Sequence, residues 1–347
     1  MNKLYILYFY IFFLFYSVTC YAQRNPADCR LKIVFYNCEN FFDIYDDPVK
    51  NDNEFLPQSK KNWTAERYQT KVNNISRVIC AIDSINLPDI VGLCEIENGK
   101  TLADLIKNQN LSRGAYKAVH FESSDDRGID VALLFDSSAA KVLSARPVPV
   151  SFSGVKLREI LYAKTVVFNS DTLHIFVNHW KSRSGGIAET QSKRIMYASV
   201  LKKITDSLFL KNPNANIIIM GDLNDEPGDT SVFRELNAQG MVKNPQPQKL
   251  YNLFYDFYKA GQGSYYYGGD KKWNMMDQII LSGNLFSSQK NVLHYVPGSA
   301  EIFRRNWLLY QSPKSQMLPS KTYSGTMYHG GFSDHLPVTV SLVKKHK

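Results

Sequence analysis

Short apolar runs that end in acidic or amide side chains recur along this chain, and they constrain its fold more than any other feature. Residues 89–94 form such a run and end at Glu95, and residues 216–220 open onto Gly-Asp-Leu-Asn-Asp at 221–225. Short apolar runs bounded by polar residues are typical of buried strands. We therefore expect a strand-rich protein whose chemistry lies where the strands end.

The stretches around these runs predict both helices and closely spaced strands. In residues 64–82 apolar positions recur every three or four residues behind Thr64, a suitable N-cap, which indicates an amphipathic helix. The strands expected between 129 and 177 follow one another too closely for a simple alternation of strand and helix, which favours antiparallel pairing within one α/β domain. Further helices are expected at 101–108, 187–209 and 228–236, and strands at 31–36, 129–135, 141–150, 160–168, 172–177, 275–281 and 336–342.

Two segments lack a clear period. Residues 43–62 are polar and rich in turn residues, so we expect a loop there. Residues 287–331 are aromatic, basic and poorly periodic. We expect them to form a long insertion beside the site rather than a second domain.

The first 22 residues have the pattern of a signal peptide, with Lys3, an almost uncharged run at 4–18 and a small-residue exit at Ala22. An uncleaved membrane anchor is one alternative, but the run is shorter than the roughly 20 apolar residues that a spanning helix needs. Lipid attachment at Cys20 is a second alternative. We expect an exported protein, periplasmic or secreted, with a catalytic domain at 30–345, no membrane span in the mature chain and a monomeric state.

Charge and cysteine content add weaker constraints. Loss of Lys3 with the signal peptide would change the formal net charge from +9 to +8, and a basic protein meets phosphate-bearing partners more readily. The absence of C-x-x-C spacing argues against a zinc site, while disulfides in an exported protein are possible with the pairing left open. The cysteines that would remain are Cys29, Cys38, Cys80 and Cys94.

The polar strand ends suit the cleavage of phosphoesters, which needs a Lewis acid at the phosphate, an in-line water and help for the leaving group. Hard cations such as Mg²⁺ bind carboxylate and amide oxygens. A single island of such residues is a weak signal, because Asp-x-Asn after a strand is a common turn. Six islands occur here, at 37–40, 95–98, 178–182, 221–225, 273–277 and 333–337.

Together and in this order, the islands resemble the endonuclease/exonuclease/phosphatase superfamily, which includes pancreatic-type deoxyribonuclease, abasic-site endonucleases, bacterial sphingomyelinases and inositol polyphosphate phosphatases. The most specific pieces are residues 89–95, 221–224 and 333–337, and the match runs from about residue 31 to residue 343. The resemblance implies an α/β fold of four layers (α/β/β/α), in which a two-sheet β-sandwich is flanked by helices. It also implies a metal-dependent phosphoesterase.

The resemblance implies a set of metal ligands. Glu95 is the expected ligand, with Asn37 nearby and Asp334 available to the same ion or to a second one. Glu39 could belong to this metal site or lie outside it. The expected ion is Mg²⁺, with Mn²⁺ or Ca²⁺ as alternatives. Asp130 could face the phosphate or make a structural contact instead.

The resemblance also implies catalytic residues. Asp277 is expected to orient His335 and to support its charge. Asp222 and Asn224 would contact the scissile phosphate, and Asp222 would also handle a proton. His179 resembles the second histidine of the deoxyribonuclease and sphingomyelinase branches, which the abasic-site branch lacks. The tyrosine that the abasic-site enzymes use has no clear counterpart in this sequence.

An exported nuclease is the first functional hypothesis, with nucleic acid as the partner. Basic residues close to His179 could follow a phosphate backbone. Two of them, Lys193 and Arg194, could instead lie on the exposed face of the following helix. The four residues are Lys181, Arg183, Lys193 and Arg194.

A phosphatase or phosphodiesterase that acts on phospholipid headgroups or small phosphoesters is the alternative. The aromatic residues of 265–267 and 303–310 could then form an apolar contact surface. They could equally pack against the sheet, and residues 265–267 could form the strand before the catalytic one. A non-catalytic binding protein is a third class, which the joint presence of Glu95, Asp222 and His335 disfavours.

Overall fold

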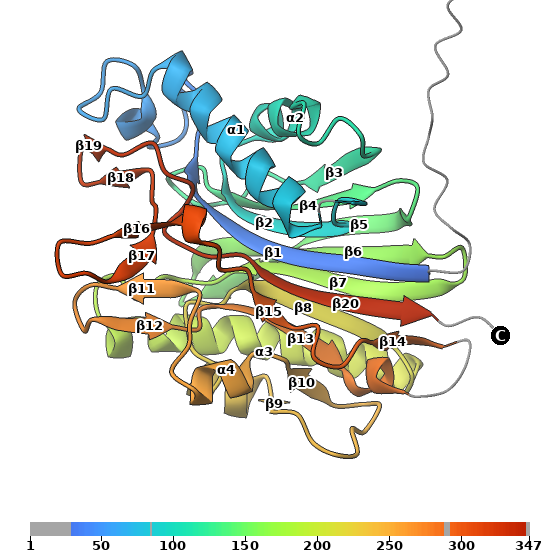
Figure 1. The fold of residues 1–347 in the computed structure, drawn as a ribbon. Helices are drawn as coiled ribbons and strands as arrows, with labels where there is room; N and C mark the ends of the chain where they lie inside the picture. Colours follow the sequence, from blue (N-terminus) through green and yellow to red (C-terminus); the bar gives the residue numbers. More distant parts are fainter. Residues whose placement is uncertain (1–28, 84, 288–291, 345–347) are drawn as a thin grey trace, which may run out of the picture.

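Two seven-stranded sheets pack face to face, with helices on both outer sides, in the computed structural model of this protein (Figure 1). The structure describes residues 29–83, 85–287 and 292–344. The predicted fold class, a two-sheet β-sandwich flanked by helices, is confirmed. The signal peptide predicted at residues 1–22 lies outside the described residues.

The first sheet, sheet A, contains the first strand and the last strand of the described chain side by side. Its order is β14 (Leu293–Tyr295), β20 (Val338–Lys344), β1 (Cys29–Phe41), β2 (Ile90–Ile96), β4 (Asp130–Asp136) and β3 (Tyr116–His120), with β15 (Glu301–Ile302) also paired to β20. The second sheet, sheet B, has the order β5 (Ala140–Phe152), β6 (Val155–Val167), β7 (Asp171–His179), β8 (Asn216–Asp222), β13 (Asp277–Ser282), β10 (Leu250–Asn252) and β9 (Ala238–Gln239).

Each sheet has a parallel pair of strands near its centre, and the chain between the two strands of the pair holds a helix. The pair β1 and β2 is connected through α1 (Ala65–Ile82), and β7 and β8 are connected through α3 (Ile187–Lys211). The remaining α-helices are α2 (Gly99–Lys107), which with α1 covers sheet A, and α4 (Tyr255–Lys259), on the side of sheet B (Figure 1). Because parallel strands end at one edge, each pair presents two strand ends together.

Three apolar clusters hold these layers together. Phe35, Ile175 and Val340 belong to the cluster between the sheets. Further clusters lie between sheet A and its helices and between sheet B and α3. Full burial of one large apolar side chain stabilises a fold by about 1.5–3 kcal/mol. The sheets approach closely at Gly92 of β2, where an added Cβ atom would lie 2.6 Å from the sulfur of Met220 in β8.

The helix predictions hold, with one exception. The hydroxyl of Thr64 caps α1 by accepting a hydrogen bond from the backbone N–H of Arg67, at 3.4 Å. Residues 228–236, expected to form an α-helix, instead form a wider π-helical turn at Thr230–Glu235. The expected loop at 43–62 contains a short 3₁₀ turn, Asn53–Phe55. None of the described helices is both long and apolar enough to span a membrane.

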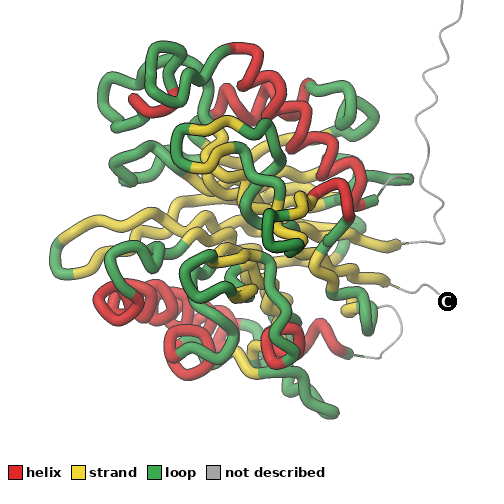
Figure 2. The backbone as a smooth tube through the Cα atoms, turned by 60° about the vertical axis from the view of Figure 1, so that its left-hand side comes forward, coloured by secondary structure: helices red, strands yellow, loops and turns green. Residues whose placement is uncertain are grey.

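The segment 287–331 is more regular than its sequence suggests, because β14 and β15 extend sheet A. The rest of it forms two hairpins beside the hairpin that precedes β13. Figure 2, in which this end of the molecule comes forward, shows loops and short hairpins gathered in front of the strands. The hairpins are β11 (Tyr265–Tyr267) with β12 (Lys272–Asn274), β16 (Leu309–Gln311) with β17 (Met317–Pro319), and β18 (Tyr323–Ser324) with β19 (Met327–Tyr328), and the 3₁₀ turns are Gly283–Phe286 and Asn306–Leu308.

Candidate active site

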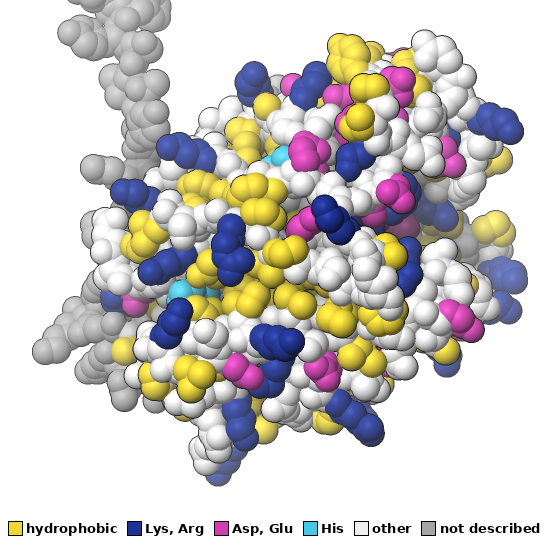
Figure 3. Space-filling model, turned by 180° about the vertical axis from the view of Figure 1, so that it is seen from behind, with side chains coloured by type: hydrophobic (Ala, Val, Ile, Leu, Met, Phe, Trp, Pro, Cys, Tyr) yellow, Lys and Arg dark blue, Asp and Glu magenta, His cyan; other side chains and the backbone are white. Residues whose placement is uncertain are grey.

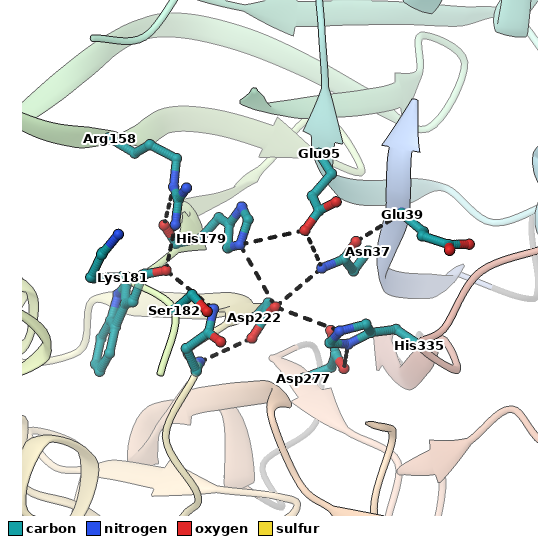
Figure 4. A network of polar contacts seen from close by, with 12 residues as sticks. Asn37, Glu39, Glu95, Arg158, His179, Lys181, Ser182, Asp222, Asp277 and His335 are labelled. Carbon is teal, nitrogen blue, oxygen red and sulfur yellow. Dashed lines mark hydrogen bonds and ion pairs between the residues drawn. The ribbon is translucent and has the colours of Figure 1, made fainter. Parts of the chain in front are cut away.

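The two parallel strand pairs end at one place, and their polar residues meet there (Figure 4). In sheet B, His179 of β7 lies opposite Asp222 of β8, and Asp277 of β13 lies opposite Asp222 on the other side. In sheet A, Asn37 of β1 lies opposite Cys94, one residue before Glu95. Both sheets therefore contribute to a single site.

Asn37 joins the two sheets at this site. Its buried side-chain amide donates hydrogen bonds to Asp222 Oδ2, at 3.1 Å, and to Glu95 Oε1, at 3.4 Å. Its Oδ1 atom accepts from the backbone N–H of Glu39, at 2.9 Å. An amide suits this position because it can donate to two acidic groups without adding a third negative charge.

Glu95 stands at an irregular point of its strand. Its φ is +59°, and the register of β2 with β4 shifts between Cys94 and Ile96. A non-glycine residue in this conformation is strained, and bulges that redirect a side chain are common beside functional sites. The Oε2 atom of Glu95 accepts from the backbone N–H of Asn40, at 2.7 Å. Its carboxylate is thereby held facing Asn37 and His179.

His335 and Asp277 form a buried pair. Nδ1 of His335 lies 2.6 Å from Oδ2 of Asp277, and the hydroxyl of Ser264 donates to the same oxygen. Burial alone would lower the pKa of His335, yet the Asp277 carboxylate raises it well above its ordinary value. The ring of Tyr265 stacks on the imidazole, with 4.6 Å between ring centroids.

Asp222 lies between the two histidines. Its Oδ2 atom is 3.8 Å from Nε2 of His179 and 3.9 Å from Nε2 of His335, and its Oδ1 atom accepts from the backbone N–H of Asn224. Burial raises the pKa of Asp222 to about 6, with His335 opposing the shift and Asp277 adding to it. The residue before it must be glycine, because a Cβ atom on Gly221 would lie 2.5 Å from the carbonyl oxygen of Asn178.

His179 is held as a neutral imidazole. Burial, then Arg158 and Arg127, lower its pKa well below the ordinary value. Its Nδ1 atom is buried and has no hydrogen-bond partner in the described part of the chain. The proton therefore belongs on Nε2, because an unpaired acceptor costs less free energy than an unpaired donor. Nε2 lies 3.9 Å from Oε1 of Glu95.

The strand end that carries His179 is fixed by Arg158 of β6. Its guanidinium donates to the carbonyl oxygens of His179, at 3.0 Å, and Trp180, at 2.7 Å, and forms an ion pair with Asp125. Sequence reasoning missed this residue. The sequence around Arg158 also contains Lys156 and Glu159, so no local signal distinguished this arginine.

The loop after Asp222 is held by two arginines that we expected to be available to a nucleic-acid backbone. Arg183 donates to the carbonyl oxygen of Asn224 and pairs with Asp225 and Asp229. Arg194 is fully buried, and its Nε lies 2.7 Å from Oδ1 of Asp225. The alternative that Arg194 lies on an exposed helix face is therefore wrong, and both arginines have structural partners.

Asn224 also belongs to this loop. Its φ is +50°, and its side-chain amide donates to the carbonyl oxygen of Trp180, at 3.2 Å. In this arrangement one amide hydrogen is used within the protein. The other remains available, so the contact with a phosphate that we expect of Asn224 stays a prediction.

Glu39 points away from the carboxylates of Glu95 and Asp222 (Figure 4). Its Oε2 atom accepts from the backbone N–H of Thr322, at 2.6 Å, and lies 3.7 Å from the buried ammonium of Lys71. That ammonium donates to the hydroxyl of Thr322 and to the carbonyl oxygen of Phe332. Of the two roles left open for Glu39, this geometry favours the one outside the metal site.

Asp334 is buried near both Glu39 and Glu95. Burial raises the pKa of Asp334 to about 7, and Glu39 and Glu95 add to the shift. Asp130, by contrast, is bonded within sheet A, where Oδ2 lies 2.8 Å from Nε2 of His120. Of the two roles expected for Asp130, this geometry therefore favours a structural contact over a contact with the phosphate.

The site has the donor set that a hard cation requires. The charge of Glu95 adds to the rise in the pKa of both Asp222 and Asp334, for which burial is the main cause. Gathering carboxylates in this way costs free energy, which a divalent cation would offset. Among the described residues, two other groups have ligand atoms within 4.8 Å of one another: His120, Glu122 and Asp130 at sheet A, and a second set at the site, Asp222, Asp277 and His335. The tight bond between His335 and Asp277 makes that second set better suited to proton handling.

The aromatic residues around the site are only partly packed. Phe303 and Leu308 are buried, and the ring of Tyr266 packs against Trp273 on the far side of the β11–β12 hairpin from Tyr265. Tyr267 and Tyr310, by contrast, are exposed. Packing therefore accounts for the buried members of the set, and the apolar contact surface stays a prediction for the two exposed tyrosines. Tyr265 is a residue of the site that sequence reasoning treated only as a possible contact surface or strand.

Comparisons with known proteins identify the family and the fold. A family model described as the endonuclease/exonuclease/phosphatase family matches residues 32–344. A comparison with curated proteins finds no match.

Solved structures with the same fold include an endonuclease/exonuclease/phosphatase family protein of Bacteroides thetaiotaomicron, with a TM-score of 0.56 and 14% identity over 92% of this chain and 98% of that one. A mannosyl-6-phosphatase of Bacteroides thetaiotaomicron has a TM-score of 0.56 and 15% identity over 90% and 99%. Truncated TDP2 of Caenorhabditis elegans has a TM-score of 0.54 and 14% identity over 90% and 97%.

Proposed function

This chain belongs to the endonuclease/exonuclease/phosphatase family, whose members hydrolyse phosphoester bonds, and from that premise we propose that it is a metal-dependent hydrolase of phosphodiesters. One observation carries the proposal. The His335–Asp277 pair, Asp222 and Glu95 converge from both sheets on one place. Neither sheet alone supplies both the proton-handling groups and the acid that would hold a cation.

Glu95 and Asp334 would hold the cation, with Asn37 beside them, and Mg²⁺ is the first candidate. When bound, a divalent cation supplies charge stabilisation at the phosphoryl oxygens. The remaining chemistry falls to the side chains of this chain.

Asp222 and His335 have complementary proton states. With a pKa of about 6, Asp222 is largely ionised at neutral pH and can accept the proton of the attacking water. His335 is kept protonated by Asp277, so Nε2 can donate a hydrogen bond to a phosphoryl oxygen. As the water oxygen bonds to phosphorus, the bond to the leaving oxygen breaks, and solvent supplies the proton for that oxygen.

Nucleic acid is the substrate that we propose first. Lys181 follows His179 by two residues and Lys193 lies on α3, and neither forms an ion pair with another described residue, which leaves both available to phosphate. A small phosphoester is the second candidate. Two observations support this candidate. Arg183 and Arg194 already pair with Asp225 within the protein. On the face seen from behind, the Lys and Arg residues are dispersed rather than gathered in one stripe (Figure 3). Export remains part of the proposal, on the pattern of residues 1–22.

An activity screen of residues 24–347 tests the proposal. Plasmid DNA, RNA, sphingomyelin, mannose 6-phosphate and a chromogenic phosphodiester are each incubated with Mg²⁺, with and without chelator. His335→Ala serves as the matched control for contaminating enzymes. Nicking of DNA or degradation of RNA that requires both the metal and His335 would support a nuclease. Turnover restricted to the small esters would select the second candidate, and no turnover of any substrate would contradict the proposal.

A further inference from the structure

The dipeptide Ser264-Tyr265 contacts both members of the His335–Asp277 pair. The Ser264 hydroxyl donates to Asp277 Oδ2, and its carbonyl oxygen accepts from the backbone N–H of Leu336, at 2.8 Å. Tyr265 forms an isolated β-bridge with His335. Two neighbouring residues of one hairpin thus hold the pair through side chain, backbone and ring.

The ring contact is specific in its geometry. The rings of Tyr265 and His335 lie 4.6 Å apart at an interplanar angle of 28°, which is a stacked arrangement. The bond from Asp277 fixes only Nδ1 of the imidazole, at 2.6 Å, and so leaves the ring free to tip about that bond. A ring lying over one imidazole face opposes this tipping. The direction in which Nε2 points therefore depends on Tyr265 as well as on Asp277.

The neighbouring residue offers an internal comparison. Tyr266 has the opposite orientation, as expected for successive residues of a strand. Its ring meets Trp273 edge-on, with 5.6 Å between centroids, and its hydroxyl donates to Gln316. Both tyrosines are half-buried on β11, yet only Tyr265 contacts His335.

We propose that Tyr265 is a positioning residue, whose ring holds the imidazole of His335 in the orientation needed for phosphoester hydrolysis. The proposal rests on the proposed function, because it assigns Tyr265 a part in the same reaction. It concerns the ring and not the hydroxyl, since stacking is the contact that Tyr265 makes with His335. Phenylalanine should therefore replace it, whereas leucine should not.

Three variants test the proposal on whichever substrate the screen identifies. Tyr265→Leu should lower kcat by about 10- to 100-fold with KM changed by less than about 3-fold, because misplacing a reacting group by about 1 Å can cost about 100-fold in rate. Tyr265→Phe should keep kcat within about 3-fold of wild type, since the ring remains. Tyr266→Leu is the matched control, and it should keep wild-type kcat even if it lowers the stability of the hairpin.

A second readout does not depend on activity. The carbon-bound ring protons of His335, assigned by comparison with His335→Ala, should show an upfield NMR shift caused by the stacked ring. That shift should persist in Tyr265→Phe and Tyr266→Leu and disappear in Tyr265→Leu.

The possible outcomes separate the two proposals. If Tyr265→Leu folds, loses the ring-current shift and keeps wild-type kcat, the positioning role is wrong while the hydrolase assignment stands. If the shift is absent from the wild-type protein, the stack itself does not exist in solution. If wild type hydrolyses no phosphoester although the shift is present, the proposed function fails and the positioning role fails with it.

Discussion

The side-chain amide of Asn37 donates a hydrogen bond to Asp222 Oδ2, at 3.1 Å, and this bond links the end of a strand in one sheet to the end of a strand in the other. Asn37→Ala would leave Asp222 and Glu95 without their shared donor. We expect kcat to fall by about 100-fold and the free energy of unfolding by about 1–3 kcal/mol, as for the loss of a buried hydrogen bond to a charged group. Initial rates and urea unfolding would measure the two effects, and wild-type values for both would contradict the linking role.

Asp277→Asn tests the orientation of His335. An asparagine can turn its NH₂ group toward Nδ1 and so favour the wrong tautomer of the imidazole. We expect kcat to fall by about 10³- to 10⁴-fold with the fold intact, by analogy with other carboxylate–histidine pairs. Steady-state kinetics measure kcat, and near-UV circular dichroism checks that the fold is intact. A decrease of less than about 10-fold would mean that Asp277 does not control the reactive state of His335.

Glu95 and Glu39 are expected to differ in their relation to the metal. Glu95→Gln should raise the Mg²⁺ concentration needed for half-maximal rate by about 10- to 100-fold or more, because it weakens a ligand. Glu39→Gln should leave that concentration nearly unchanged but lower the melting temperature, because Lys71 would remain buried without its partner. Metal titrations and thermal unfolding of both variants decide the matter. If Glu39→Gln raised the Mg²⁺ requirement and Glu95→Gln did not, Glu39 would be the metal ligand.

Arg194→Met should destabilise the protein rather than alter substrate binding. The change removes the fully buried one of the two arginines that pair with Asp225 and leaves only Arg183, and breaking a buried ion pair typically costs about 3–5 kcal/mol. Lys193→Ala, one residue earlier on α3, is the control and should change stability by less than about 0.5 kcal/mol. Urea unfolding compares the two. Equal stability of Arg194→Met and wild type would show that the pair carries no net stabilisation.

Glu97 should make stability depend on pH. Burial, with added repulsion from Asp43 and Asp52, raises the pKa of Glu97 to about 8 from an ordinary 4.5. Between these values the folded state keeps a proton that the unfolded chain has lost, so stability falls as the pH rises from about 4.5 to about 8. Glu97→Gln should flatten this decline and gain about 1 kcal/mol or more at about pH 9. Urea unfolding of both proteins at about pH 5 and pH 9 measures the effect, and parallel curves would refute it.

The strand ends were the predictable part of the site, because an apolar run followed by an acid or amide is a local pattern. Glu95 and Asp222 were recognised in this way, whereas Asp277 was recognised as an acid at the head of a strand. Asp277 and Asp222 lie opposite each other on the antiparallel strands β13 and β8, and the packing of the two sheets brings Glu95 to them. The direction in which Glu39 points could not be predicted. It is decided by Thr322, which lies 283 residues further along the chain.

Arg194 and Tyr265 illustrate two further limits of the sequence. Charge alone assigns Arg194 to the surface, and only the fold provides the buried carboxylate that pairs with it. The alternation of side chains along β11 indicates that Tyr265 and Tyr266 face opposite ways, but not which of them meets the histidine. Likewise, β14 and β15 join sheet A by pairing with β20. Each is only two or three residues long, so its own sequence shows no alternation of apolar and polar residues that would predict a strand.

The pairing of β1 with β20 makes the two ends of the domain depend on each other. Residues 29–35 of β1 find their antiparallel partners in residues 338–344, more than 300 residues further along the chain. A chain cut before β20 would therefore expose one edge of β1, a strand near the middle of sheet A, and would be prone to associate with other chains through that open strand edge.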